Sequence, residues 1–280
     1  MKNFLLVPFF VLLIQGCNPL IDTYQSEVKE RLASLTFENI PLLQEEEISE
    51  LPEVVQKYIR YTGSLNKEKI LVAEAVYKDA RIKMNPDRNW LKVTCQQMNF
   101  TEPPSRHFYI HSRLLGIVPF NGRDIYAGGQ GNMRIRLFNA FTVADDTSSE
   151  MDQSALVTYL QEPVIMPSAF LSEQIEWIAS DSISATARIS DHGIAATGTF
   201  FFNQEGKITR FVTNDRYYAP QGEKPRKIKW SITFVNYKNC SGFMLPTQFV
   251  ATWHMDEGDF IYIKGDMETI KFNNDVTPIP

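Results

Sequence analysis

Three residues carry the side chains that acid–base chemistry needs: Asp152, Glu162 and His254. Two carboxylates and an imidazole can move protons to and from a substrate when they are buried within hydrogen-bonding reach of one another. The favoured alternative gives each residue a structural place. Asp152 then caps a helix, Glu162 is a charge at the end of that helix, and His254 lies on the surface of a strand. No serine occupies a G-x-S-x-G motif, which argues further against a hydrolase.

Two other groups of side chains could bind charged ligands. His107 and His111 are four residues apart and would share a face of a helix, but the strand predicted there places them too far apart to bind one metal ion. We therefore expect no metal site and no cofactor. Arg134 and Arg136 share one face of a predicted strand. They would meet an anionic head group if that face is inward, or surface acids if it is outward, and the outward alternative is favoured.

The start of the chain indicates export. Lys2 is followed by an apolar run, Phe4–Ile14, that is too short to span a bilayer, so residues 1–16 are typical of a signal peptide. The run ends in Leu13-Ile14-Gln15-Gly16-Cys17, which resembles a bacterial lipobox. That resemblance implies that Cys17 becomes the lipid-modified N-terminus and anchors the protein to a membrane of the bacterial cell envelope, in a leaflet left open. The alternative is a plain signal peptide with an incidental cysteine.

Composition limits the possible partners. The chain has 280 residues, of which 44% are hydrophobic, and a formal net charge of −5. Such a length allows a substantial core. An acidic chain without basic clusters is a poor partner for nucleic acid, because phosphate binding needs a basic surface. Cys95 and Cys240 could form a disulfide in an oxidising compartment or serve separately as small buried side chains.

Three helical segments must position these residues. Residues 17–50 are expected to be a lipidated tether containing a short amphipathic helix, Tyr24–Leu35, which could lie on the domain or on the membrane; docking on the domain is favoured. Leu51–Gly63 is a second helix, with Pro52 in its first turn and Gly63 at its stop. The third is a central insert, residues 152–171. Its helix would begin at Asp152 and end near Glu162, because Pro163 cannot continue it.

The remainder of the chain alternates with the period of two that is typical of strands. A single domain, residues 51–273, is expected, with residues 274–280 as a loose tail. Gly128, Gly129 and Gly131 lack the strand–helix context of a phosphate loop and indicate a hairpin turn. The expected strands are Ile70–Lys78, Trp90–Phe100, Phe108–Leu115, Arg123–Ala127, Met133–Phe141, Ile175–Ala179, Ser182–Ser190, Ile194–Asn203, Lys207–Tyr217, Arg226–Tyr237, Thr247–Met255 and Phe260–Phe272.

So many antiparallel strands curl, which predicts a mainly β, α+β fold: a large curled antiparallel sheet, or half-barrel, covered by helices. This order of elements resembles the lipoprotein-carrier fold of LolA and LolB, which implies an apolar cavity for acyl chains. The chain also resembles a group of bacterial proteins without assigned function, from which no site residues carry over. The segments that carry this second resemblance are Leu51–Gly63, Met151–Leu171 and Pro246–Gly265.

The sequence therefore predicts a lipid-anchored, non-enzymatic envelope protein that binds a hydrophobic or lipid-like ligand in a half-barrel cavity. Two alternatives remain open: an envelope hydrolase that uses Asp152, Glu162 and His254, and a structural assembly partner with an exposed apolar patch. No particular protein partner is indicated. The same aromatic pattern fits a filled core as well as a cavity lining. The candidate ligand-binding residues are Tyr58, Tyr159, Trp177, Trp230 and Trp253.

Overall fold

The computed structural model describes residues 19–220 and 223–277. The expected signal peptide, residues 1–16, and Cys17 lie outside the described residues.

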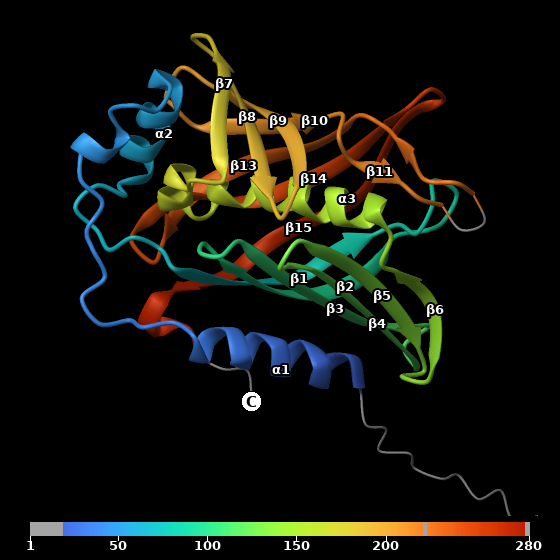
Figure 1. Cartoon of the computed structure of the whole chain (residues 1–280). Helices are drawn as coiled ribbons and strands as arrows, with labels where there is room; N and C mark the ends of the chain where they lie inside the picture. The colour runs from blue at the N-terminus through green and yellow to red at the C-terminus, as the bar shows by residue number, and fades with distance from the viewer. Residues whose placement is uncertain (1–18, 221–222, 278–280) are drawn as a thin grey trace, which may run out of the picture.

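One antiparallel sheet of 13 strands dominates the molecule, in the order β6-β5-β4-β3-β2-β1-β15-β14-β13-β10-β9-β8-β7 (Figure 1). These strands are β1 (Val72–Ile82), β2 (Leu91–Phe100), β3 (Ser105–Leu114), β4 (Val118–Ala127), β5 (Gln130–Leu137), β6 (Phe141–Asp146), β7 (Ile175–Ser180), β8 (Ser184–Asp191), β9 (Ile194–Phe202), β10 (Ile208–Thr213), β13 (Trp230–Cys240), β14 (Phe243–Met255) and β15 (Gly258–Phe272). A separate pair is formed by β11 (Tyr217–Tyr218) and β12 (Arg226–Lys227).

The sheet topology places the helical insert in the hollow of the curled sheet. β1 and β15 pair in the middle of the strand order, whereas β6 and β7 are its two edges. The insert joins these two edges, so it has to cross one face of the sheet. It consists of α3 (Ser149–Leu160), η2 (Glu162–Val164) and η3 (Pro167–Leu171). The expected curled sheet covered by helices is confirmed as an open half-barrel.

Helix α3 lies between the two halves of the sheet. It packs against β4 and β5 on one side and against β8 and β9 on the other (Figure 1). Every residue from Ser154 to Leu160 is buried. This enclosed half needs no solvent-facing polar stripe. Its serine and threonine side chains are hydrogen-bonded: Thr158 Oγ1 donates to the Ser154 carbonyl over 2.7 Å, and Ser154 Oγ accepts from the Tyr217 N–H over 3.0 Å.

The expected start of this helix was wrong. Ser148 is the N-cap, and its hydroxyl accepts a hydrogen bond from the Met151 N–H over 3.2 Å. Asp152 lies in the first turn and accepts from the Gly131 N–H over 2.7 Å, so its carboxylate links α3 to β5. The expected end near Glu162 is confirmed, since α3 stops at Leu160 before Pro163.

Helix α1 (Pro19–Ala33) covers the opposite, convex face of the sheet (Figure 1). Its buried side chains, Tyr24 and Val28 among them, pack with Met98 and Tyr109. The described part of residues 17–50 is therefore docked on the sheet and is not a loose tether, because burying this apolar face is favourable. The expected tail is also docked in part, since Val276 is buried in the same cluster. A short η4 (Asn273–Asp275) precedes Val276.

Helix α2 (Glu53–Thr62) packs against η3, β8 and β14, and a short η1 (Glu46–Ile48) comes before it. Gly63 ends α2 as predicted, with a left-handed φ of 69°. Pro52 is the N-cap and not a first-turn residue.

Three expected strands were each split in two: Lys207–Tyr217 between β10 and β11, Arg226–Tyr237 between β12 and β13, and Met133–Phe141 between β5 and β6, which form a hairpin. Phe138 and Asn139 both have positive φ and form the turn of this hairpin. The Gly128–Gly129 turn between β4 and β5 is confirmed.

Candidate functional site

A cavity of about 1000 Å³ lies between the inner face of the sheet and the helical insert. Most of its wall is apolar. Phe108, Ile110 and Ile135 come from β3 and β5, and Ile232 and Phe249 face them from β13 and β14. Side chains alternate between the two faces along each strand, so every second one points into the hollow and lines the cavity. The volume is that of a typical small-molecule site.

A buried ion-pair cluster forms part of this wall. Arg106 Nε donates to Glu162 Oε1 over 2.9 Å, and Arg106 Nη1 donates to Asp124 Oδ2 over 3.0 Å. Asn99 Nδ2 donates to Glu162 Oε2 over 3.0 Å, and Gln161 Nε2 donates to Glu162 Oε1. The cluster joins β2, β3 and β4 to η2, so it holds the insert against the sheet.

Burial governs the ionisation of this cluster. Burial of Glu162 raises the pKa of its carboxyl above the ordinary value, against the opposing effect of Arg106. Burial alone would lower the pKa of Arg106, but Asp124 and Glu162 outweigh it and raise that pKa. Asp124 Oδ1 is buried and accepts no hydrogen bond within the described part of the chain.

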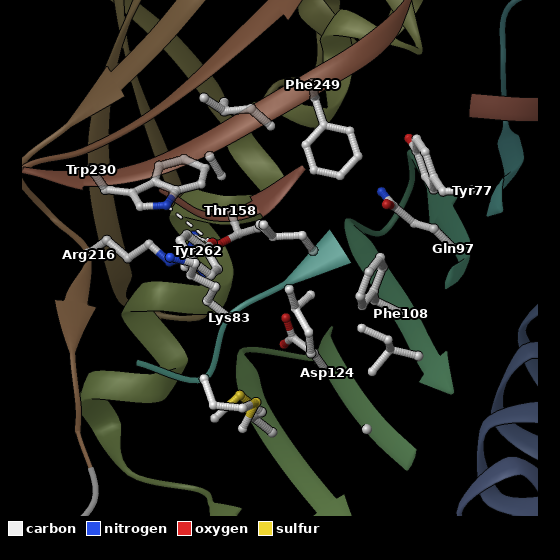
Figure 2. Close-up of a pocket in the computed structure, with 18 of the residues that line it drawn as sticks. Tyr77, Lys83, Gln97, Phe108, Asp124, Thr158, Arg216, Trp230, Phe249 and Tyr262 are labelled. Carbon is white, nitrogen blue, oxygen red and sulfur yellow. Dashed lines mark hydrogen bonds between the residues drawn. The ribbon is translucent and has the colours of Figure 1, made fainter. Parts of the chain in front are cut away.

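A second charged group, Arg216, lies on another part of the wall (Figure 2). Its guanidinium carbon is 4.4 Å from the centre of the Trp230 ring and 5.3 Å from that of Trp253. Arg216 Nη1 donates to the Tyr262 hydroxyl over 3.0 Å, and Trp230 Nε1 donates to the same oxygen over 3.2 Å. The wall therefore presents a cation held among aromatic rings.

The three residues considered for acid–base chemistry do not share hydrogen bonds. Asp152 binds the Gly131 N–H, and Glu162 belongs to the Arg106 cluster. His254 lies on β14, where its Nδ1 is 2.7 Å from Asp259 Oδ1 and its Nε2 is 2.9 Å from Ser231 Oγ. Of the three, only Glu162 lines the cavity. It lies just after the end of α3, where the structural alternative puts it, but it is buried within the wall.

Among the five aromatic candidates for ligand binding, Trp230 lines the cavity. The other four pack in the core around it. Tyr58 donates to the Val164 carbonyl over 2.6 Å, and Tyr159 donates to the Phe100 carbonyl over 2.9 Å. Trp177 packs against Phe170 and Phe200, and Trp253 stacks near Arg216.

The cysteine and arginine pairs singled out in the sequence do not line the cavity. Cys95 and Cys240 are free thiols, and burial raises the pKa of Cys95 to about 12. Arg134 pairs with the acid Asp145 over 2.7 Å, as the outward alternative predicts, whereas Arg136 donates to the Ala140 carbonyl over 3.0 Å. Within residues 19–220 and 223–277, no cluster of His, Cys, Asp and Glu is arranged to hold a metal ion. Nor does any helix in that part of the chain have the length and apolarity to cross a membrane.

Sequence reasoning missed Arg106, Asp124 and Arg216. Arg106 on β3 and Asp124 on β4 meet only because of the register in which these two strands pair. Arg216 lies just after β10, and its aromatic neighbours come from β13, β14 and β15. No local motif marks either group.

The fold and the cavity define a class: an open antiparallel half-barrel with a helical insert in its hollow and an interior cavity. Residues 41–265 match the model of DUF6544, a family of unknown function, and the chain belongs to that family. The expected membership of a group without assigned function is thereby confirmed.

Several solved structures are similar to the chain, among them the following three. A putative outer membrane lipoprotein-sorting protein domain from Vibrio parahaemolyticus is 8% identical, with a TM-score of 0.37 over 74% of this chain and 87% of that one. A LolA superfamily protein from Nitrosomonas europaea is 11% identical, with a TM-score of 0.41 over 80% and 93%. A DUF1329 family protein from Desulfovibrio piger is 10% identical, with a TM-score of 0.44 over 80% and 93%. A search of the curated proteins finds no match.

Proposed function

We propose that this protein binds a hydrophobic or lipid-like molecule in its half-barrel cavity, without catalysing a reaction, in the bacterial cell envelope. The observation that carries the proposal is the cavity of about 1000 Å³ with its largely apolar wall. Each methylene group transferred from water into such a cavity contributes about 0.8 kcal/mol. A chain of ten or so methylenes would therefore bind well without any specific polar contact.

We further propose that Cys17 is lipid-modified and anchors the protein to a membrane. The direction of α1 supports this. Arg31, in its last turn, donates to the Pro103 carbonyl over 3.2 Å in the turn between β2 and β3, while the Tyr24 ring lies 5.5 Å from that of Tyr109 further along β3. Pro19, two residues after Cys17, therefore lies toward the other end of the strands.

That end of the sheet carries the turns between β3 and β4 and between β5 and β6. Large apolar side chains at these turns are exposed: Leu115 is 95% exposed, Ile117 74% and Phe141 66%. Exposed apolar side chains in one region are typical of a contact with a membrane or a partner. Their position near the start of α1 supports a sheet end that faces the membrane. The same side chains favour the second candidate function, an envelope assembly partner.

Native mass spectrometry with lipid extraction, on the full chain purified from its own envelope, tests these functions. A co-purifying amphiphile supports the carrier function. A protein with an empty cavity and a stoichiometric protein partner would overturn it in favour of assembly. For the anchor, Cys17→Ser should move the protein from the membrane fraction to the soluble fraction, and an unchanged membrane fraction would contradict lipid modification.

A further inference from the structure

The cavity wall holds a cation without a neutralising partner. Aromatic faces surround the Arg216 guanidinium, with Tyr262 contributing a third ring at 6.0 Å. Cation–π contacts stabilise a guanidinium but leave its charge in place. No carboxylate within residues 19–220 and 223–277 forms an ion pair with Arg216. Its neighbour Asp215 pairs with Lys227 over 2.8 Å instead.

A lysine and a hydroxyl donor lie on the same wall as Arg216. The Lys83 backbone N–H donates to the Tyr262 carbonyl over 2.7 Å, which places Lys83 next to Tyr262 on the same wall (Figure 2). The Lys83 ammonium lies 5.3 Å from the Trp90 ring and has no ion pair in the described part of the chain. The Tyr262 oxygen already accepts from Arg216 and Trp230, so its own proton is left to donate to a third group.

The rest of the wall disfavours an anion. The cluster around Arg106 holds two carboxylates, Asp124 and Glu162, for one guanidinium. It therefore repels the anionic group of a ligand. The other acids of the lining, Asp87 and Glu223, are exposed. The Arg216 side is therefore the part of the cavity where an anionic group is stabilised.

Resting on the ligand-binding function above, we propose that the cavity selects amphiphiles with an anionic head group, a carboxylate or a phosphate. The head group binds the fork of Arg216, with the Tyr262 hydroxyl beside it, because a planar guanidinium matches both anions bidentately. The apolar chain then lies along the apolar lining near Phe249 and Phe108 (Figure 2).

Four probes with one chain length test this selection by calorimetry: dodecanoate, dodecyl phosphate, dodecanol and dodecyltrimethylammonium. The full chain should bind both anions at least about tenfold more tightly than dodecanol, since a hydrogen bond to a charged group has that effect. In Arg216→Gln that preference should disappear, because only the anionic probes lose a charged partner. Arg216→Lys, which keeps the charge, should retain part of it and serves as the second variant if Arg216→Gln does not fold.

Arg210→Gln is the matched control, because Arg210 also stacks on an aromatic ring, Phe201 at 4.7 Å, but is exposed and does not line the cavity. Equal affinity for all four probes would overturn the anion selection and leave the ligand-binding function standing. Tighter binding of the ammonium probe would also overturn it. Inorganic phosphate that competes as well as dodecyl phosphate would show a free-anion site and contradict an amphiphile. Failure of every probe to bind would overturn both proposals.

Discussion

Arg106 on β3 donates a hydrogen bond to Glu162 on η2 over 2.9 Å, and this ion pair is almost completely buried. It connects the sheet to the insert that crosses its hollow. A buried pair contributes little net stability over a well-packed apolar pair, but removal of one partner leaves a charge uncompensated.

Arg106→Leu should therefore destabilise the protein by about 3–5 kcal/mol. Glu162 would lose its cation while remaining buried, where burial already raises the pKa of its carboxyl. Urea unfolding followed by tryptophan fluorescence measures the loss. Lys78→Ala breaks the exposed pair with Glu268 and should cost less than about 1 kcal/mol. Equal losses in the two variants would show that the buried pair does not hold the insert.

Gly131 is the second point at which the insert meets the sheet. A Cβ at this position would lie 2.5 Å from the Met151 carbonyl oxygen and 2.9 Å from the Ala155 side chain. Because the nearest atom is backbone, α3 would have to move, and Gly131→Ala should destabilise by about 1–3 kcal/mol. Thermal unfolding measures this. Thr142→Ala, at an exposed position of β6, should stay within about 0.5 kcal/mol of the wild type. An unchanged melting temperature for Gly131→Ala would contradict the close packing.

Local patterns predicted most elements of this fold. The alternation of Ile232 and Phe234 with polar neighbours identified β13, and Gly63 identified the end of α2. Two of the errors have a clear local cause. Ser148 and Asp152 are both good caps, and the sequence does not say which is used. Phe138 is an apolar residue in a left-handed turn, so the β5–β6 hairpin looked like one continuous strand.

The site was harder to predict because it depends on the sheet as a whole. Glu162 was recognised as a titratable residue, but its partner Arg106 is 56 positions earlier in the sequence. Arg106 and Glu162 come into contact because the insert connects the two edges of the sheet across its hollow. The register of β3 and β4 then places Asp124 beside Arg106. A cavity and a filled core require the same apolar pattern, so the hollow itself could only be seen in three dimensions.

Acid should weaken the docking of α1. Burial alone would raise the pKa of Glu27, but its contacts with His107 and Arg123 outweigh burial and bring the pKa below the ordinary value of 4.5. A carboxyl with a depressed pKa in the folded state adds stability above its ordinary pKa, and that stability is lost as pH falls through the lower, folded pKa. Hydrogen exchange of the α1 amides between pH 7 and about pH 3 should therefore show protection falling with acid.

Glu27→Gln should lower α1 protection at neutral pH and flatten its dependence on acid below pH 4.5. Glu30→Gln removes the same charge from an exposed position of α1 and should leave the wild-type profile unchanged. A Glu27→Gln profile that runs parallel to the wild type would assign the acid sensitivity to another group.

Partly filling the cavity should weaken ligand binding without unfolding the protein. Ile135 on β5 points into the hollow, so Ile135→Trp places a large ring in the space available to an acyl chain. Excluding even two methylenes costs about 1.6 kcal/mol, which lowers the affinity for dodecanoate by more than about tenfold. Val235→Trp adds the same ring on β13, where Val235 is 44% exposed and does not line the cavity, and it should bind normally. Calorimetry with both variants, together with near-ultraviolet circular dichroism to check folding, decides the matter. Normal binding by a folded Ile135→Trp would place the ligand elsewhere on the molecule.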